Sequence, residues 1–495
     1  MQRIFSNDID ALERSFRERY SGIDDIKINR LHGWKTDCLL VFCDGMIDLG
    51  KCWQILVRPV LRLLRNPFMT QRRFMQALYR NIDASFDISR HTDSAELIHA
   101  VMGGAAVILA AGVPYAISIG LPGYSHRAVS DSFTEQNVRA SREGFTEPLK
   151  INQTLIRRRL KSEQLVFESM CVGKVSKTDI SVVYLKDRAA PQLVRGVKQR
   201  LGECELDTVL ESGVLEPFLA KRESRLISGV GHTERPDVLC AKLREGKVAV
   251  LVDGTPFAIL VPHLFFENFQ NMDDYSGRGY YANFIRLIRL FAFFVSCFFP
   301  GIFVAMVNFN PELIPSTLLF NIARGAFSTP MPLMLEALFI HFVYELVREA
   351  GLRLPQPVGH SVSLIGALVV GDAAVNAGFV SSSMVMIIAF AAICSYTVPS
   401  LYEPIAVLRP VFIVLGGIMG PLGVVIGLSL AALDVFSTES YGVPYTAPAV
   451  PFSALLFHDS MLRKSWLHLS QSDIKLQDIG DKNGEVMQGD ERSQG

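Results

Sequence analysis

The feature that most constrains the fold of this chain is the segregation of its apolar residues. Of 495 residues 49% are hydrophobic, and the long apolar runs cluster between Phe284 and Phe436. About 20 helical residues cover the hydrocarbon core of a bilayer. Four runs are close to that length or exceed it, at residues 284–307, 361–380, 383–401 and 411–436. We therefore expect an all-α polytopic membrane domain at residues 283–455, built from four to six helices.

One further segment, residues 331–350, has a mixed character. Its first half is mostly apolar, whereas ionisable side chains occur at Glu336, His341, Glu345, Arg348 and Glu349. The sequence leaves open whether this segment crosses the bilayer or lies along its surface. Charged side chains within a crossing segment should face the interior of the helical bundle, because lipid does not solvate them.

The last apolar run, residues 411–436, contains small residues and a proline. Gly416 and Gly420 are one helical turn apart, as are Gly423 and Gly427, and this spacing is typical of close helix contacts in lipid. The proline at position 421 lacks a backbone hydrogen-bond donor. We therefore expect one kinked span that packs closely against a neighbouring helix.

The run 361–380 places two polar side chains near its middle. At helical spacing, one of its faces presents Ser361, Ile365, Leu368, Asp372 and Asn376. A carboxylate that faces lipid is costly, so this face should contact a partner helix or water. Two interpretations stay open: the face lines a pore or ion path, or Asp372 makes a structural polar contact between helices.

The first 282 residues have the charged composition of soluble domains. We expect two sheet-containing α/β subdomains here, at residues 1–160 and 161–282. Residues 1–30 show no apolar core of a secretory signal, so this region is predicted to stay in the cytoplasm. Arg286 and Arg289 at the start of the first span agree with that orientation. The polar C-terminal tail, residues 456–495, is expected to be partly disordered.

Charge and motif content argue against several functions. The chain carries 49 basic and 49 acidic residues, and this balance argues against a nucleic-acid-binding protein. Its eight cysteines do not form a paired zinc pattern with histidines, so we predict reduced thiols and no metal site. Residues 359–363 resemble a nucleophile elbow, but Ser363 replaces the second glycine of that motif. We expect no catalytic residue, no cofactor and no enzymatic activity.

A short internal repeat argues against a membrane span in the N-terminal region. Residues 101–121 are apolar enough to mimic a span, but Pro114 and its neighbouring glycine interrupt them. Matching residues recur at an offset of 142 in residues 246–261, where Lys247 and Asp253 make a span unfavourable. Both copies therefore predict strand–turn–strand hairpins. An old duplication and convergent hairpin chemistry are the two explanations of the match.

Between the two copies lies a basic run, Arg157-Arg158-Arg159, in a segment that we expect to be helical. Such a run binds an anionic partner or a lipid headgroup, or it forms a solvated helix face that pairs with its own acidic neighbours. The solvated face is the more frequent arrangement in proteins.

Seven sequence motifs follow one another between residues 144 and 448. They are GFTEPLKINQTLIRRRL (144–160), TERPD (233–237), VAVLVDGTPFAILVP (248–262), FIRLIR (284–289), LVREAGLRLP (346–355), GALVVGDAAV (366–375) and SYGVPYTAP (440–448). Together they resemble the A-subunits of spore germinant receptors, the GerA family. The resemblance covers roughly residues 100 to 460. Several long motifs in the same order are far more specific than one short signature.

The resemblance implies an integral protein of the spore inner membrane that acts as the A-subunit of a nutrient receptor. It further implies a homo-oligomer, with a pentameric ring as the expected form, and partnership with a transporter-like B subunit and a lipoprotein C subunit. Such a ring is a nutrient-gated ion channel whose release of monovalent cations triggers germination. Carried onto this chain, the pore-side candidates are Ser361, Leu368 and Asp372.

Two further groups are candidates for gating or interdomain roles: Glu345, Arg348 and Glu349, and Glu234, Arg235 and Asp237. The first group is either a gating network or a self-paired helix end. For the second group we expect a structural salt bridge from Arg235 to an acidic neighbour. Many members of the family carry glutamine or glutamate where this chain has Asp372, so its ion preference is expected to differ.

Two functional hypotheses follow from these observations. A ligand-gated channel subunit predicts that Leu368→Ala makes the pore leaky. A non-conducting scaffold or germination-signal amplifier, as in sporulation paralogues of the same family, predicts that membrane substitutions act only through assembly. A secondary transporter is a weaker third alternative, because the spans show no inverted repeat.

Overall fold

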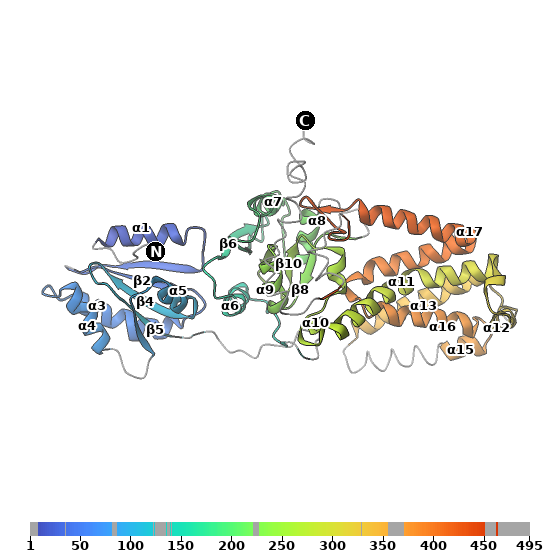
Figure 1. Cartoon of the computed structure of the whole chain (residues 1–495), viewed down its shortest axis with the longest axis horizontal. Coiled ribbons are helices and arrows are strands. Elements are labelled where there is room, and N and C mark those ends of the chain that lie inside the picture. Colours follow the sequence, from blue (N-terminus) through green and yellow to red (C-terminus); the bar gives the residue numbers. More distant parts are fainter. Residues whose placement is uncertain are drawn as a thin grey trace, which may run out of the picture.

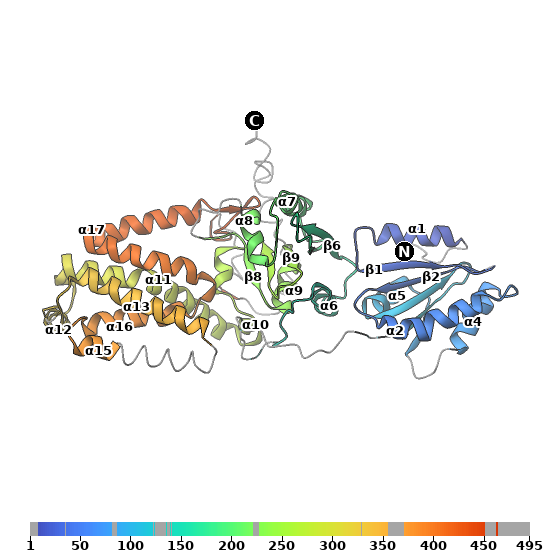
Figure 2. The same ribbon diagram turned by 180° about the vertical axis from the view of Figure 1, so that it is seen from behind.

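The computed structural model describes residues 8–34, 36–81, 87–121, 123, 135, 139, 141–220, 227–327, 329–354, 371–450 and 462–463. These residues form an elongated molecule in which two α/β units and a helical domain follow one another along the long axis (Figure 1). The view from behind shows the first unit and the helical domain at opposite ends (Figure 2). The predicted fold class, an α/β region followed by an all-α domain, is confirmed.

The first unit is built on an antiparallel sheet with the strand order β1-β2-β4-β5-β3. Its strands are β1 (Ile26–Leu31), β2 (Cys38–Cys43), β3 (Ile88–His91), β4 (Ala105–Ala110) and β5 (Ala116–Gly120). Helices cover both faces, so every residue of β2 is buried, as its unbroken apolar run predicts. One face packs against α1 (Ile9–Arg19) and α5 (Ser94–Met102), and the other against α2 (Leu49–Lys51), η1 (Cys52–Val57), α3 (Arg58–Leu64) and α4 (Gln71–Asn81).

The second unit has the same design. Its sheet order is β6-β7-β9-β10-β8, from β6 (Leu165–Val172), β7 (Thr178–Leu185), β8 (Gly231–Thr233), β9 (Val248–Val252) and β10 (Ala258–Val261). One face packs against α6 (Leu149–Arg159) and α9 (Pro236–Arg244), and the other against α7 (Pro191–Gly202), η2 (Ser212–Leu215) and α8 (Glu216–Leu219). Because α6 shares the second core, it belongs to this unit, whereas the expected boundary at residue 160 placed it in the first.

Both hairpins predicted from the internal repeat are present. Strands β4 and β5 pair with each other, as do β9 and β10. Their turns contain Gly112 and Gly254 with φ angles of 69° and 89°, which favour glycine because it has no Cβ. The apolar side chains of residues 105–120 fill the core of the first unit, so the rejection of a membrane span there is confirmed.

A buried ion pair joins the two units. The Arg157 side chain is 1% exposed, and its Nε and Nη2 atoms donate to the carboxylate of Asp25 at 2.9 Å. Arg158 and Arg159 pair instead with Glu143. Both interpretations of the basic run are therefore wrong for Arg157, which is neither solvated nor accessible to an external anion. A buried pair of this kind fixes orientation, because either charge alone is costly to bury.

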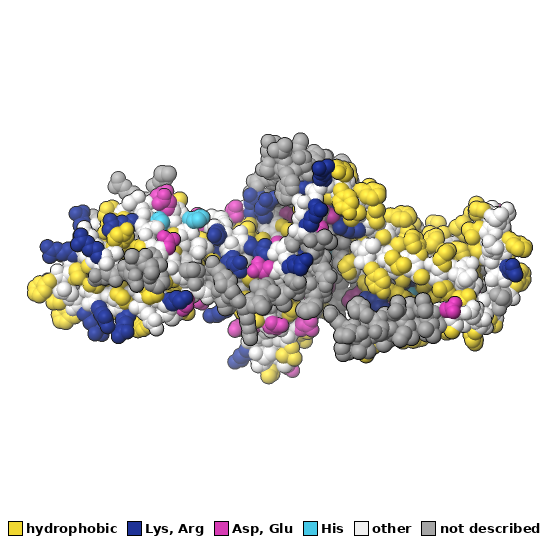
Figure 3. Space-filling view, turned by 90° about the horizontal axis from the view of Figure 1, so that it is seen from below, with side chains coloured by type: hydrophobic (Ala, Val, Ile, Leu, Met, Phe, Trp, Pro, Cys, Tyr) yellow, Lys and Arg dark blue, Asp and Glu magenta, His cyan; other side chains and the backbone are white. Residues whose placement is uncertain are grey.

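The helical domain consists of α11 (Gly279–Phe309), η4 (Pro311–Leu313), α12 (Ser316–Ala326), α13 (Leu333–Arg353), α15 (Gly371–Asn376), α16 (Ser382–Ser395), η6 (Pro399–Leu401) and α17 (Tyr402–Phe436). Short elements connect it to the second unit: η3 (Phe265–Phe269), α10 (Asp273–Ser276), β11 (Glu439–Ser440) and β12 (Val443–Pro444). Among the described residues, two helical stretches are long and apolar enough to cross a bilayer, Gly279–Phe309 and Pro399–Phe436. On the face seen in Figure 3, many exposed apolar side chains lie on the described surface of this domain.

Helix α17 reverses direction in its middle, where only a kink was expected. Gly420 has φ 63° and ψ −148°, which no helix contains. A Cβ atom on Gly427 would lie 2.7 Å from the side chain of Leu415, although twelve residues of straight helix span about 18 Å. The two arms of α17 therefore lie against each other, and they meet at one end of the domain (Figure 1). The single span predicted at 411–436 is thus wrong.

The expected close glycine contacts are confirmed between α11 and the first arm of α17. A Cβ atom on Gly416 would lie 2.3 Å from the carbonyl oxygen of Gly301. In the reverse direction, a Cβ atom on Gly301 would lie 2.4 Å from the carbonyl oxygen of Phe412. Any larger residue at either position separates the two backbones, so glycine is what permits this packing.

Two other expected spans differ from the structure or are only partly covered by it. For the run 383–401, α16 ends at Ser395 after 14 residues, which is about 21 Å and shorter than the hydrocarbon core. Of the run 361–380, residues 361–370 lie outside the described residues. Its described part contains α15 and then a turn at Gly378, whose φ is 70°. Apart from residues 462–463, the tail 456–495 also lies outside the described part.

Candidate functional site

The helical domain contains a group of polar side chains centred on α13, which we call the α13 cluster. Its members are His341, Tyr344, Glu345, Arg348, Tyr402 and Arg409. The positions 341, 345 and 348 recur at helical spacing, so they share one face of α13. That face is directed at the first arm of α17, which contributes the last two members. The segment 331–350, whose character the sequence leaves open, therefore directs His341, Glu345 and Arg348 toward neighbouring helices of the domain.

Tyr402 connects α13 to the start of α17. Its hydroxyl donates to Oε2 of Glu345 at 2.5 Å, and the guanidinium carbon of Arg348 lies 3.2 Å from its ring centre. A second phenol pair, Tyr344 to Tyr396, joins α13 to the residue after α16 at 3.1 Å. Two charged groups of α13 thus hold one aromatic ring between them.

Arg409 is the most deeply buried member of the α13 cluster. It is 0% exposed, and it donates to the backbone carbonyls of Ser296 at 2.9 Å and Ala391 at 3.3 Å. It therefore ties α11 and α16 to α17. Its Nη1 atom has no hydrogen-bond partner among the described residues.

Two more atoms of the α13 cluster share this property. Nδ1 of His341 and Oε1 of Glu345 are buried without a hydrogen bond to any described residue, and they lie 3.9 Å apart. Buried polar atoms are nearly always paired, and leaving one unpaired costs roughly 1–3 kcal/mol. The α13 cluster therefore contains a donor on Arg409 and an acceptor on Glu345 whose hydrogen bonding is incomplete among the described residues.

The N-terminal end of α13 makes a separate polar contact. Glu336 is 0% exposed, and its Oε1 atom accepts hydrogen bonds from the backbone N–H of Ser381 and from its hydroxyl at 2.5 Å. Ser381 in turn caps α16 through Met384. Polar contacts therefore hold α13 at two places, near its start through Glu336 and in its middle through the α13 cluster.

The predicted gating group divides in the structure. Glu345 and Arg348 belong to the α13 cluster, whereas Glu349 pairs with Arg353 one turn later at 2.6 Å. Both side chains of that second pair are more than half exposed. The sequence left open a gating network or a self-paired helix end. Glu349 forms a pair within its own helix end, and a gating role for Glu345 and Arg348 stays a prediction.

The predicted pore face is described only in part. Ser361, Ile365 and Leu368 lie outside the described residues. Asp372 and Asn376 are exposed on α15, and Nδ2 of Asn376 donates to Oδ2 of Asp372 at 3.0 Å. These two side chains therefore share a helix face, as their spacing predicts. Their role in a pore stays a prediction.

The 233–237 motif builds a buried network within the second unit. Arg235 is 1% exposed and donates to both carboxylate oxygens of Asp237, at 3.1 and 2.6 Å, which is the salt bridge expected from the sequence. Thr233 donates its hydroxyl to Glu135 at 2.9 Å. Burial raises the pKa of the Glu135 carboxyl to about 7. The backbone carbonyl of Glu234 accepts from Phe145 at 2.7 Å, which fixes the chain that leads into α6.

The sequence did not reveal two charge clusters at the junction with the helical domain. Asp274 of α10 accepts from Arg286 at 3.1 Å and from Arg289 at 2.8 and 3.0 Å, so these arginines are anchored to α10. From the sequence alone, these two arginines indicate only the orientation of the first span in the membrane. Arg463, from the C-terminal region, adds a bond to the Gly277 carbonyl at 2.8 Å.

The second cluster at this junction is a carboxylate between two lysines. Lys247, 1% exposed, and Lys242 both donate to Glu267 of η3. Burial alone would raise the pKa of Glu267, but the two ammonium groups outweigh it and hold that pKa well below its usual range. The second sheet is thereby fastened to the segment that leads into α10 and α11.

A family model described as Bacillus/Clostridium GerA spore germination protein matches residues 14–473. Spore germination protein KA of Bacillus subtilis (strain 168) is 34% identical over 452 residues, covering 91% of this chain and 82% of that protein. The uncharacterized membrane protein YfkQ of the same strain is 33% identical over 429 residues, covering 86% and 83%. The crystal structure of the N-terminal domain of the A subunit of the Bacillus megaterium spore germinant receptor GerK3 aligns with a TM-score of 0.42 and 23% identity, covering 53% of this chain and 97% of that one. By the extent of the family match, the chain belongs to the GerA family of spore germination proteins.

Proposed function

We propose that this chain is the A-subunit of a nutrient germinant receptor, and that several copies form a nutrient-gated ion channel in the spore inner membrane. One observation carries the proposal: the α13 cluster holds ionisable side chains with incomplete hydrogen bonding inside an apolar helical domain. Ionisable groups within membrane helices are costly and mark ion paths, proton relays and gates. Opening would release monovalent cations and so trigger germination.

The gate in this proposal is the contact between α13 and the first arm of α17. Tyr402 is held by Glu345 through a hydrogen bond and by Arg348 through ring stacking. Hydrogen bonds to charged groups contribute roughly 1.5–3 kcal/mol each. Loss of this contact therefore shifts a closed–open equilibrium by about tenfold or more, since 1.4 kcal/mol is a factor of ten. A nutrient signal need only separate these two helices.

The proposed ion path uses the polar face of α15. Asp372 and Asn376 are exposed in the single chain, and an exposed carboxylate is costly at membrane depth. Neighbouring copies in a homo-oligomer, expected to be a pentamer, would enclose such faces around water. The partners are a transporter-like B subunit and a lipoprotein C subunit, by resemblance to the family. The two α/β units would then lie on the cytoplasmic side.

The test is potassium release from dormant spores that carry single variants at normal protein abundance. Tyr402→Phe removes the hydroxyl that bonds Glu345, and we expect spontaneous release about tenfold above the parent strain. Asp372→Asn should instead change the nutrient-driven rate or the ion preference. Glu349→Gln is the control, because its partner Arg353 is exposed and the pair lies outside the α13 cluster.

Unchanged release in both variants, with the protein present at normal level, would overturn the channel proposal. The chain would then be a non-conducting scaffold or signal amplifier, whose polar contacts only hold its helices together. Loss of the protein from the membrane of both variants would support that scaffold function as well. Altered release at normal abundance is the result that the channel proposal requires.

A further inference from the structure

The first unit carries an unusual concentration of positive charge. Between residues 49 and 82 the chain has seven basic residues and no acidic one: Lys51, Arg58, Arg62, Arg65, Arg72, Arg73 and Arg80. All seven side chains are exposed. Lys51 pairs with Asp48, whereas the six arginines form no ion pair with any described residue. We call this surface the basic face.

Helix geometry gathers these charges on one side of the unit. Lys51, Arg58, Arg62 and Arg65 recur at intervals of seven, four and three residues from the end of α2 to the residue after α3. Leu56 and Val60 of the same stretch are fully buried in the core. Helix α4 packs beside α3 and contributes the remaining arginines. The stripe from residue 51 to residue 65 is about 21 Å long. Figure 3 shows dark-blue side chains gathered over the end of the molecule that the first unit forms.

Exposed aromatic rings accompany the arginines. Trp34 is 76% exposed, Trp53 57% and Phe68 84%. The backbone N–H of Trp34 donates to the carbonyl of Leu64 at 3.2 Å, so the backbone of residue 34 lies at the end of α3. Three exposed aromatic rings within so short a segment provide a candidate contact surface for a partner.

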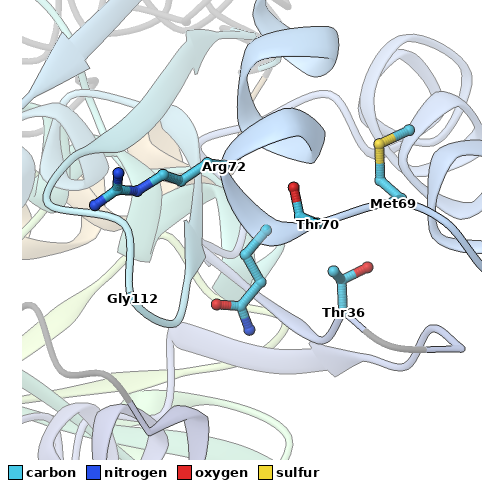
Figure 4. Close-up of a pocket in the computed structure, with 6 residues that line it drawn as sticks. Thr36, Met69, Thr70, Arg72 and Gly112 are labelled. Carbon is cyan, nitrogen blue, oxygen red and sulfur yellow. The ribbon is translucent and has the colours of Figure 1, made fainter.

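A hollow at the start of α4 adds uncharged donors to the basic face. It has a volume of about 400 Å³ and is lined by Thr36, Met69, Thr70, Gln71, Arg72 and Gly112 (Figure 4). Thr36 is 2% exposed, and its hydroxyl has no partner among the described residues. The first-turn N–H groups of a helix also lack partners within the helix and favour a negative group nearby. Arginines in this turn lie near the positive end of the helix dipole, which is unfavourable. A bound anion would reduce this repulsion.

The corresponding segment of the second unit does not share this property. At the offset of 142 residues, positions 191–224 carry five basic and six acidic residues. The zero net charge of the whole chain therefore conceals a segregated distribution. The segment of the first unit is strongly basic and the equivalent segment of the second unit is nearly neutral, so the shared fold does not require the basic face.

We propose that the basic face binds the phosphate backbone of a nucleic acid. Arginine forks match phosphate oxygens, and exposed aromatic rings beside them provide stacking surfaces for unpaired bases. The bilayer around α11 and α17 is not the occupant, because the first unit lies at the opposite end of the elongated chain (Figures 1 and 2). The expectation from net charge that the protein avoids nucleic acid does not apply to a surface that is locally basic.

The test uses the full chain in detergent micelles with fluorescently labelled 20-nucleotide single-stranded DNA, measured by anisotropy across a salt series. In the triple variant Arg58→Ser, Arg62→Ser, Arg65→Ser, we expect affinity to fall about tenfold or more. The slope of log affinity against log salt should fall in magnitude by about 2, because each lost contact contributes about 0.7 for a single strand. The matched control is Lys161→Ser, Lys186→Ser, Arg195→Ser, which removes three exposed cations from the second unit.

Three outcomes would overturn the proposal. The parent chain fails to bind DNA at 100 mM salt, or the control variant loses as much affinity as the triple variant. The third is that DNA binding is unchanged while binding to phosphatidylglycerol vesicles is lost, which would assign the basic face to anionic lipid. Circular dichroism of both variants separates loss of charge from loss of fold, and serine at these exposed positions should leave the spectrum unchanged.

Discussion

The two α/β units match element by element over their second half. From the third strand to the fifth, every element of the second unit begins within a few residues of its counterpart shifted by 142. Helices α5 and α9 each have nine residues, and β5 and β10 begin at Ala116 and Ala258. The strand order is also the same in both sheets. A duplication explains this constant offset more simply than two hairpins that converged on similar turns.

The two units differ where the second one attaches to other parts of the chain. Lys247 occupies the position of Ala105, and it pairs with Glu267 of η3. Asp253 occupies the position of Ala111, and it accepts a hydrogen bond from the backbone N–H of Leu149 at 2.9 Å, the first residue of α6. Alanine makes neither contact. The polar replacements in the second copy are therefore the residues that connect its sheet to neighbouring elements.

The largest effect is expected from Glu267→Gln, which removes the only negative charge that Lys247 contacts among the described residues. Lys247 would stay buried as an unpaired cation next to Lys242, and breaking a buried pair in this way costs roughly 3–5 kcal/mol. We expect hydrogen exchange of the β9 and β10 amides to accelerate strongly in the full chain, with the first unit unchanged. Such a result would show that the contact between Lys247 and Glu267 stabilises the second unit and not the first.

Glu245→Gln is the control for that experiment. Glu245 also pairs with Lys242, but its side chain is 39% exposed, so the loss should be within about 0.5 kcal/mol. The double variant Lys247→Ala, Glu267→Ala should be less unstable than Glu267→Gln alone, because it leaves one buried lysine fewer without a partner. A double variant that is more unstable than the single one contradicts this account.

A pH-dependent effect is expected at the N-terminus of α9. The equivalent position in the first unit is Asp93, which caps α5, whereas α9 has Arg235 there with Glu135 nearby. Burial raises the pKa of Glu135 to about 7, above its ordinary 4.5, so the folded chain binds the extra proton. The contribution of this group to stability is present below pH 4.5 and is lost as pH rises to 7, by on the order of 3 kcal/mol.

Glu135→Gln tests this prediction, because the amide keeps an acceptor for Thr233 without the titration. Local stability around β8 and α9, measured by hydrogen exchange corrected for its intrinsic pH dependence, should then stay level between pH 5 and 8. In the parent chain it should decline over the same range. Equal slopes in the two proteins would show that Glu135 does not control this stability.

Comparison of sequence with structure shows which features are locally encoded. The hairpins, β2 and α7 follow from apolar runs and turn residues that lie within a few positions of one another. The reversal at Gly420 was missed, because the proline after it predicts a bend equally well. Arg157 pairs with Asp25, which is 132 residues away in the sequence, and no local pattern identifies such a pair. Arg409 was missed for the same reason, since its partners lie on two other helices.

The smallest effect is expected from Asp253→Ala, which gives the second unit the residue that the first unit has at this place. Loss of a side-chain acceptor at a helix N-terminus costs about 1 kcal/mol, so α6 amides should exchange about fivefold faster. Asp187→Ala, an exposed change on the same unit, should leave them unaffected. Helix α6 also carries Arg157, whose ion pair with Asp25 joins the two units. If faster exchange extends to the amides around Asp25, the hairpin turn of the second unit also supports this ion pair between the units. Exchange confined to the first turn of α6 would limit Asp253 to a local cap.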